Sequence, residues 1–233
     1  MATPDTIGNV LWWLRSTEEV QHSLGRVTQW GDKKTTNSSR DLFATGTFQP
    51  FLQSGSLNGL PVIEFQDTHC LSGTFITGSA PLTVATVCKW ARLTQPPSNY
   101  DYLLNWGDDT TNDNLSISRW QGSNDITKSA YFNDDGAGNY TGYSPLSGSV
   151  WMKMVVLHNT STVKHRLFVN NTESQVREMT TATSPQAPMI LGMNYHGAQF
   201  FSGSIAEVII FSKVLNTQER NDLESYFATR YGF

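Results

Sequence analysis

Short apolar or alternating runs, separated by polar turns rich in Gly and Asn, make up most of this chain. Such a pattern is typical of the strands of a β-sandwich. It predicts strands at 10–14, 27–30, 62–65, 82–90, 102–106, 115–120, 151–158, 164–169, 189–193 and 203–211. No internal repeat and no low-complexity linker divides the sequence, so we expect one domain over residues 1–233.

The run 82–90 is apolar on both of its alternating faces, which predicts a central strand covered on both sides. The run 164–169 ends at Asn170-Asn171, a pair suited to a tight turn with positive φ. Near the N-terminus, the sequence Ser-Thr-Glu-Glu at 16–19 is expected to cap one helical turn.

One helix is predicted at the C-terminus, from Asn216 to about Arg230. Asn216 is a good N-cap, and Glu219 three residues later can accept from its amide. An apolar stripe at helical spacing should pack onto the sandwich. Its residues are Leu223, Tyr226 and Phe227. Gly232 fits the end of the helix.

Composition narrows the functional classes. Aromatic residues make up 12% of the chain, including 7 Trp, which excludes a disordered protein. A net charge of −4 without a Lys/Arg cluster leaves no electrostatic basis for nucleic-acid binding. No run approaches the roughly 18 apolar residues of a membrane span, so no membrane insertion is expected. The segment 1–5 lacks a basic region followed by an apolar core, so no signal peptide is expected.

The two cysteines, Cys70 and Cys88, are too few for a four-sulfur metal site. A disulfide between them and a pair of buried free thiols both stay open. Cys88 lies in an apolar strand pattern, which favours the free thiols.

Three blocks of the sequence resemble the concanavalin A-like, laminin G-like jelly-roll superfamily, and more narrowly its bacterial and phage branch. The blocks are 11–14 with 27–32, then 57–65 (Leu-Asn-Gly-Leu-Pro-Val-Ile-Glu-Phe), and 201–232, which begins Phe-Ser-Gly-Ser-Ile-Ala-Glu-Val-Ile-Ile-Phe. The resemblance implies an all-β, two-sheet antiparallel jelly-roll sandwich with a short C-terminal α-helix, one sheet having a concave face. Residues from about 96 to 149 match no block. Loops on a rigid scaffold commonly carry binding, so this region is where we expect specificity.

The same superfamily includes glycosidases, but the sequence lacks their paired carboxylates. Retaining enzymes place two carboxylates roughly 5–5.5 Å apart. Glu64 and Asp67 fall on opposite faces of an unbroken strand, and Glu207 stands alone among apolar residues, which favours a structural role. We therefore expect no enzymatic activity.

Two loops rich in Asp and Asn, at 107–114 and 133–139, offer oxygen ligands of the kind calcium prefers. The candidate metal ligands are Asp108, Asp109, Asp113, Asp134 and Asp135. Turn chemistry is the alternative explanation, since Asp, Asn and Gly are the residues tight turns require. Laminin G-like domains often carry a calcium at the rim, so the resemblance raises calcium as the one candidate cofactor.

Aromatic residues near these loops suggest sugar binding, because sugar faces stack on Trp and Tyr while Asp and Asn bond the hydroxyls. The candidate ligand-binding residues are Trp106, Asp108, Asp109, Trp120, Tyr131, Asn133, Asp134, Asp135, Asn139, Tyr140, Asn194, Tyr195 and His196. Several of the aromatic residues are equally expected in the core, Trp120 above all.

The leading hypothesis is a non-catalytic glycan-binding or adhesion domain displayed on a particle or cell surface. The alternative is a structural protein of a phage virion, such as a capsid decoration or tail-fibre subunit, with or without glycan binding. A polysaccharide hydrolase or lyase is the second alternative. The expected partners are a host or environmental carbohydrate or virion proteins, the expected location is extracellular or the virion surface, and a homo-oligomer fits either.

Overall fold

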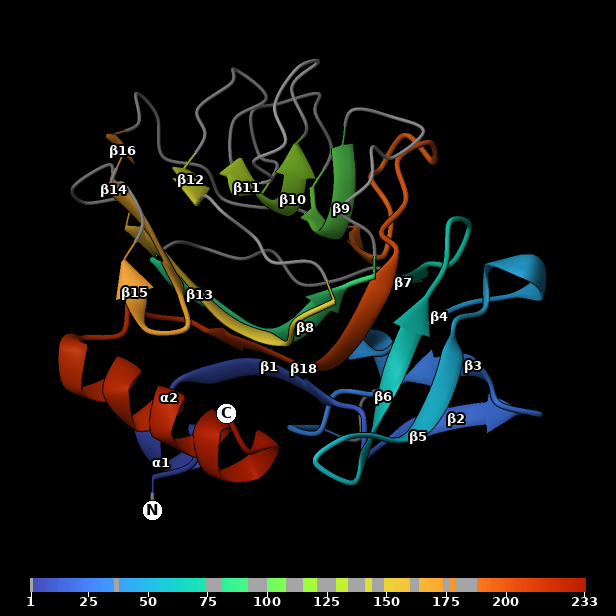
Figure 1. Cartoon of the computed structure of the whole chain (residues 1–233), viewed down its shortest axis with the longest axis horizontal. Coiled ribbons are helices and arrows are strands. Elements are labelled where there is room, and N and C mark those ends of the chain that lie inside the picture. Colours follow the sequence, from blue (N-terminus) through green and yellow to red (C-terminus); the bar gives the residue numbers. More distant parts are fainter. Residues whose placement is uncertain are drawn as a thin grey trace.

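The structure, a computed structural model, has two layers of antiparallel strands with a C-terminal helix packed beneath them (Figure 1). It describes residues 2–35, 38–73, 81–91, 100–107, 115–120, 129–133, 141–143, 149–159, 164–173, 177–178 and 188–233. In chain order the elements of these residues are α1 (Pro4–Ile7), β1 (Val10–Arg15), β2 (Val20–Ser23), β3 (Arg26–Trp30), η1 (Ser38–Arg40), β4 (Leu42–Phe43), η2 (Gly46–Phe48), β5 (Phe51–Leu57), β6 (Leu60–Phe65), β7 (Leu71–Gly73), β8 (Leu82–Trp90), β9 (Tyr100–Trp106), β10 (Leu115–Trp120), β11 (Ser129–Asn133), β12 (Thr141–Tyr143), β13 (Met152–Asn159), β14 (Lys164–Val169), β15 (Thr172–Glu173), β16 (Arg177–Glu178), β17 (Met189–Leu191), β18 (Gly203–Phe211) and α2 (Thr217–Tyr231).

One layer, the helix-side sheet, has the strand order β1, β18, β8, β13 and β14. Its central strand β8 buries Leu82, Val84 and Cys88 on one face and Ala85 and Val87 on the other. The predicted central strand with two covered faces is therefore confirmed. The hairpin from β14 to β15 turns at Asn170 and Asn171, whose φ angles of 49° and 65° confirm the predicted tight turn.

The other layer, the outer sheet, has the strand order β7, β17, β9, β10, β11 and β12. The strands predicted at 102–106 and 115–120 are present as β9 and β10, which pair with each other. At one edge β6, β5, β3 and β4 lead from β18 to β7 and join the two sheets, as the right side of Figure 1 shows.

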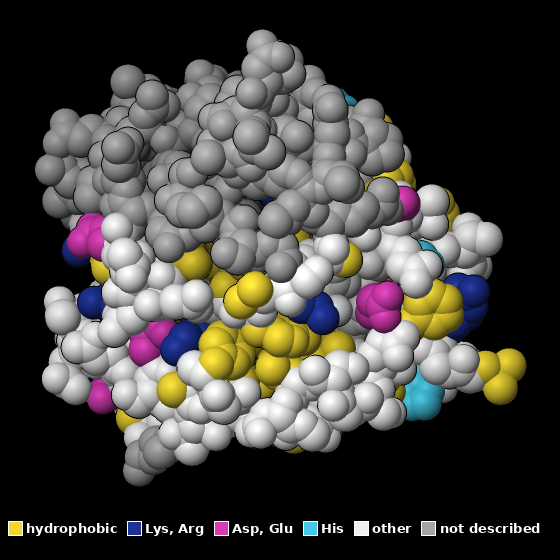
Figure 2. Space-filling view, viewed as in Figure 1, with side chains coloured by type: hydrophobic (Ala, Val, Ile, Leu, Met, Phe, Trp, Pro, Cys, Tyr) yellow, Lys and Arg dark blue, Asp and Glu magenta, His cyan; other side chains and the backbone are white. Residues whose placement is uncertain are grey.

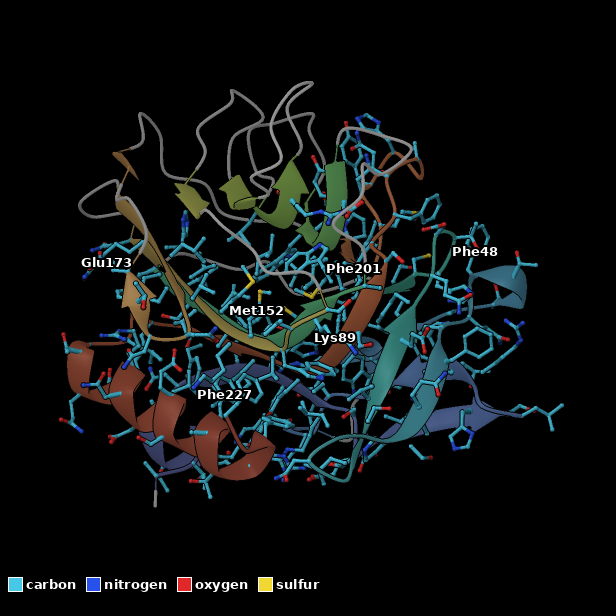
Figure 3. All side chains as sticks on the ribbon, in the orientation of Figure 1. Phe48, Lys89, Met152, Glu173, Phe201 and Phe227 are labelled. Carbon is cyan, nitrogen blue, oxygen red and sulfur yellow. The ribbon has the colours of Figure 1, made fainter. Side chains whose placement is uncertain are left out.

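The main core lies between the two sheets. Its largest fully buried side chains include Trp12, Trp30, Trp90, Trp106 and Phe201. Each large apolar side chain removed from water contributes about 1.5–3 kcal/mol to folding. Figure 3 shows Phe201 between the layers and Phe227 between the helix and the sheet.

A second cluster fills the space between the helix-side sheet and α2. Leu223, Tyr226 and Phe227 pack there, so the predicted apolar stripe is confirmed. The helix begins at the predicted capping box: the Asn216 side chain accepts from the Glu219 amide at 3.0 Å, and the Glu219 carboxylate accepts from the Asn216 amide at 2.9 Å. It ends at Gly232, which has left-handed backbone angles.

A β-bulge interrupts β18 at Ala206, where the register with β8 skips one residue. Ile205 and Val208 face the core between the sheets, while Ala206 packs towards the helix. A bulge places two neighbouring residues on one side of a strand. Glu207 therefore follows Ala206 to the helix side. At the same point the other neighbour of β18 changes from β6 to β1.

One local prediction is wrong, some elements were missed, and one open alternative is now decided. Residues 16–19 form a turn rather than a helical turn, because the Glu18 amide donates to the Arg15 carbonyl and Glu19 has a φ of 55°. The short helix α1 and the largely polar strand β5 were not predicted. Cys70 and Cys88 are both buried free thiols, so the disulfide alternative is not realised. Among the described helices, none has the length and apolar character needed to cross a membrane.

Candidate functional site

Part of the predicted site lies on the outer sheet, where β10 runs between β9 and β11. Ile117 of β10 faces the core, so Ser116 and Ser118 occupy the opposite face. Asn133 pairs with Ser116 and Tyr131 with Ser118 across β10 and β11. The two predicted residues thus occupy alternate register positions of β11, opposite two serines that are both buried. Trp120 ends β10, at the register position opposite Ser129.

Trp106 is a core residue and not a surface platform for sugars, which corrects the sequence-based expectation. It is 0% exposed and lies between the sheets. Its neighbours across β10 and β17 are Leu115 and Met189, which are also buried. The alternation of β9 places Leu104 and Trp106 on the same inward face, so the indole is enclosed.

Asn194 organises the loop after β17 and has little capacity left for a ligand. It is 3% exposed. Its Oδ1 accepts from the amides of Ala198 at 3.1 Å and Gln199 at 3.2 Å, and its Nδ2 donates to Gln199 Oε1 at 2.8 Å. The role of Asn194 is therefore to position the residues that follow it.

Those residues, Tyr195 and His196, form a ring pair in the loop that follows β17 of the outer sheet. Their ring centroids are 3.7 Å apart with a 41° angle between planes. Tyr195 is half-buried and His196 is exposed. The loop is attached to β9, because the Gly192 amide donates to the Leu103 carbonyl at 3.0 Å and Phe200 bridges to Tyr102. The two rings are thus presented from a fixed loop.

The other predicted residues lie outside the described part of the chain. They are Asp108, Asp109, Asp113, Asp134, Asp135, Asn139 and Tyr140. The calcium loops fall there too, so calcium binding stays a prediction. Within the described residues, no group of three or more His, Cys, Asp or Glu side chains is placed to hold a metal ion.

Buried polar residues on β9 and β10 were missed by the sequence analysis. Asp101 and Arg119 form an ion pair across the two strands, with side chains 3% and 1% exposed. Asn105 is fully buried, donates to the Gly107 carbonyl at 2.9 Å, and leaves its Oδ1 without a hydrogen bond. The alternation of the strands indicated polar positions here, but not their burial or their pairing.

Glu207 is the most enclosed carboxylate of the described chain and is fully occupied by donors. It accepts from Trp13 Nε1, from Arg15 Nε at 3.3 Å, from the Tyr226 hydroxyl at 2.9 Å and from the Tyr231 hydroxyl at 2.7 Å. Burial and the nearby carboxylate raise the pKa of both tyrosines, which keeps them neutral donors. These contacts support the structural role expected for Glu207.

The carboxylates of Asp32 and Asp41 also accept hydrogen bonds from neighbouring parts of the fold. Asp32 Oδ1 accepts from the amides of Trp13 and Lys34, both at 3.0 Å. Asp41 accepts from the Asp32 amide at 2.9 Å and from Gln29 Nε2 at 2.6 Å. Burial raises the pKa of the Asp32 carboxyl. Together the two side chains hold the segment after β3 against β1.

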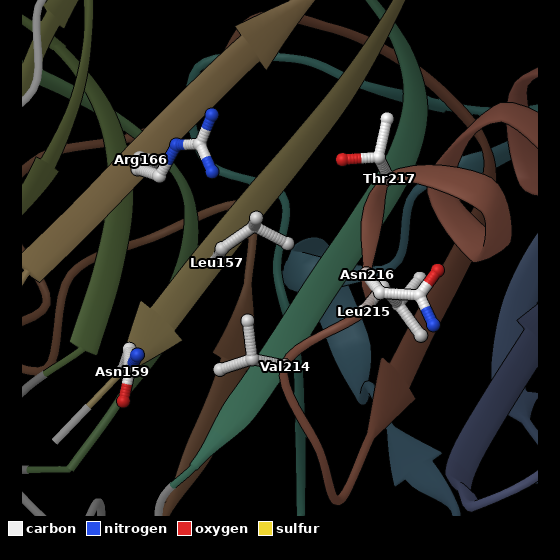
Figure 4. Close-up of a pocket in the computed structure, with 7 residues that line it drawn as sticks. All are labelled: Leu157, Asn159, Arg166, Val214, Leu215, Asn216 and Thr217. Carbon is white, nitrogen blue, oxygen red and sulfur yellow. The ribbon is translucent and has the colours of Figure 1, made fainter. Parts of the chain in front are cut away.

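A concave feature lies on the helix side, between β13, β14 and the start of α2 (Figure 4). Its volume is about 430 Å³, within the range of roughly 300–1,000 Å³ for small-ligand sites. Leu157 and Val214 supply apolar walls, and Arg166 points towards Thr217 across the opening. Arg166 already donates to both oxygens of Glu173, at 2.6 and 2.8 Å. The charged group of this pocket is therefore already satisfied.

Neither cysteine is a candidate nucleophile. Burial raises the pKa of Cys70 to about 11, and it raises the pKa of the fully buried Cys88 further. Only the thiolate is a nucleophile, so both thiols are inert near neutral pH.

Comparison with known proteins gives a family and a fold. Residues 72–219 match the family model described as the concanavalin A-like lectin/glucanases superfamily. No curated protein matches the sequence.

Three similar solved structures illustrate the range of proteins that share the fold. A heptameric SAP-like pentraxin from Limulus polyphemus has a TM-score of 0.55 at 13% identity, covering 68% of this chain and 78% of that one. The ligand-binding domain of botulinum neurotoxin serotype D, in complex with N-acetylneuraminic acid, has a TM-score of 0.61 at 10% identity. The match covers 94% of this chain and 51% of that one. An arabinofuranosidase complexed with arabinofuranosyl-α-1,2-xylobiose has a TM-score of 0.67 at 12% identity. The match covers 95% of this chain and 59% of that one. The chain thus spans little more than half of the toxin and enzyme chains. At these identities the likeness shows the fold alone.

Proposed function

Because the chain belongs to the concanavalin A-like lectin/glucanases superfamily, we propose that it is a non-catalytic carbohydrate-binding domain. The family supplies the scaffold, and function must be argued from a site, since one fold hosts many functions. The observation that carries the proposal is the Tyr195–His196 ring pair, held on the loop after β17 by the hydrogen bonds of Asn194.

The chemistry of this pair suits a sugar. The half-buried phenol ring of Tyr195 offers an apolar surface to sugar C–H groups, and the exposed imidazole of His196 can bond hydroxyls. Asn194 fixes the loop before a ligand arrives. A fixed loop lowers the entropy lost on binding.

A binding role without catalysis is supported by how the described carboxylates are used. Asp32, Asp41 and Glu207 accept several hydrogen bonds from the fold itself, and Asp101 is paired with Arg119. A retaining glycosidase instead needs two accessible carboxylates roughly 5–5.5 Å apart.

The proposal is tested by calorimetric titration with N-acetylneuraminic acid and with arabinofuranosyl-xylobiose, each with calcium and with EDTA. These ligands are chosen because similar folds are seen with them. We expect at least one to bind, and we expect Tyr195→Ala and His196→Ala each to weaken it roughly tenfold, or about 1.4 kcal/mol. His22→Ala, at an exposed histidine on β2, is the matched control and should bind as the wild type does.

Two results would count against the proposal. One is the absence of binding to these ligands and to a broad glycan array, with calcium present. The other is the release of reducing sugars or unsaturated products from polysaccharides, which would favour an enzyme. Loss of binding in EDTA alone would support the predicted calcium loops.

A further inference from the structure

A row of side chains crosses β3, β5 and β6 and continues over β18 and β8 of the helix-side sheet, on the face that carries α2. Arg26 of β3 pairs with Phe51 of β5, and Phe51 pairs with Glu64 of β6. Glu64 pairs with Ser204 of β18, which in turn pairs with Lys89 of β8. Directly opposed residues of antiparallel strands share a face, so these five residues form one continuous row.

The row ends at Trp151, just before β13, where Lys89 Nζ lies 5.1 Å from the indole centroid. We call these six residues the cross-strand row. Val62 and Ala206, the next residues on this face, already pack beneath α2, so the row lies just beyond the part of the sheet that the helix covers. Figure 2 shows hydrophobic, basic and acidic side chains side by side across the middle of this face, and Figure 3 labels Lys89 among them.

Most polar groups of the row have unused hydrogen-bonding capacity. Arg26 lies 4.6 Å over the Phe51 ring, yet neither Arg26 nor Lys89 forms an ion pair with a described residue. By contrast, Lys33 and Lys34 are both paired with carboxylates. Among the described residues, the Glu64 carboxylate accepts one hydrogen bond, from Gln66 Nε2 at 3.4 Å. Arg26 and Lys89 contact the rings of Phe51 and Trp151, but within the described part of the chain neither cation has a carboxylate partner.

The dimensions and chemistry favour a chain of neutral sugars. Strands lie about 4.8 Å apart, so the four steps from Phe51 to Trp151 span roughly 19 Å. An aromatic ring stands near each end, and donors alternate with an acceptor between them, which matches hydroxyl groups. Arg26 and Lys89 would attract an acidic polymer, but Glu64 between them would oppose one that carries a negative charge at every residue. A peptide strand would need a free sheet edge, whereas this row crosses the strands.

We propose that the cross-strand row binds an extended neutral glycan, at a surface separate from the Tyr195–His196 loop. The inference rests on the proposed carbohydrate-binding function and adds a second site to it. The domain then holds two sugar segments, one on each side of the sandwich.

The experiment titrates xylohexaose and cellohexaose into the wild-type chain and three variants, Glu64→Gln, Lys89→Met and Trp151→Ala. We expect one of these hexasaccharides to bind and each variant to weaken it roughly tenfold. Glu64→Gln and Lys89→Met each weaken a hydrogen bond to a charged group, worth about that factor, and Trp151→Ala removes the aromatic ring on which a sugar would stack. Glu64 and Lys89 are partly exposed, so their variants should melt at the wild-type temperature and exclude a folding artefact. Lys34→Met removes the same charge elsewhere and should bind normally.

The outcomes separate this inference from the proposed function. Wild-type hexasaccharide binding by Glu64→Gln and Lys89→Met would overturn the row while leaving the loop site standing. Unchanged hexasaccharide binding by Tyr195→Ala would support two separate sites. Tighter binding to polygalacturonate that falls with added salt would replace the neutral glycan by an acidic polymer. Failure of every sugar to bind would remove both proposals.

Discussion

Among single residues, Glu207 shows how one buried charge can organise a domain. Its carboxylate is 0% exposed and joins β18 to β1 through Trp13 and Arg15, and to α2 through the Tyr226 and Tyr231 hydroxyls. Removing one partner of a buried charge pair leaves the other uncompensated in a medium of low dielectric. The helix therefore depends on this carboxylate for orientation as well as on its apolar stripe for packing.

We expect Glu207→Ala to lower the free energy of unfolding by about 3–5 kcal/mol, because Arg15 and both tyrosines lose their acceptor. Urea unfolding followed by tryptophan fluorescence measures the loss. Glu18→Ala is the matched control, since Glu18 pairs with the same arginine from a side chain that is 35% exposed. Such a pair contributes only about 0–1 kcal/mol. Equal losses in the two variants would contradict a special role for Glu207.

The sequence indicated a structural role for Glu207, but not its partners. A lone acid inside an apolar strand is a visible signal. Trp13 and Arg15 lie more than 190 positions away, and only the pairing of β1 with β18 brings them close. The same limit applied to Trp106, whose position beside an acidic loop suggested exposure while the register of β9 enclosed it.

At the scale of elements, local chemistry decided what could be predicted. The bounds of β8, β14 and β18 follow from apolar runs, and those of α2 follow from its caps. The strand β5 was missed because residues 53–56 are polar and exposed, and its pairing with β6 holds it in place. Signals that come from distant neighbours are absent from a local pattern.

For α2 we expect Asn216→Ala to destabilise the protein by about 1 kcal/mol, because the Glu219 amide loses its acceptor at the helix start. Asn216→Gly should cost only a few tenths of that amount, since glycine tolerates the cap conformation and leaves the amide open to water. Thermal unfolding of the three proteins gives the comparison. An alanine variant as stable as the wild type would show that the cap is dispensable.

For the whole molecule, the two hydrophobic clusters share their strands. β8 and β18 contribute side chains both to the core between the sheets and to the cluster beneath α2. Loss of packing in either cluster would disturb β8 and β18, and the other cluster needs both of these strands. A single domain over residues 1–233, expected from the sequence, therefore implies one cooperative unfolding transition.

We expect far-ultraviolet and near-ultraviolet circular dichroism to report the same midpoint in urea, the first following the strands and the second the buried tryptophans. A calorimetric enthalpy equal to the van't Hoff value would agree with this. An early transition that releases α2 alone, with the near-ultraviolet signal unchanged, would show that the helix docks independently.

The bulge at Ala206 also determines which residues of β18 face each side of the sheet. Because the bulge adds one residue to the strand, odd-numbered residues face the space between the sheets before it, and even-numbered residues face that space after it. Deletion of Ala206 would remove the bulge and leave a regular strand in which Ile205 still faces the space between the sheets and Glu207 still faces the helix. Deletion of Ile209 would instead make Val208 and Ile210 neighbours and turn one half of the strand over. Away from the bulge, the number of residues in β18 therefore matters as much as their identity.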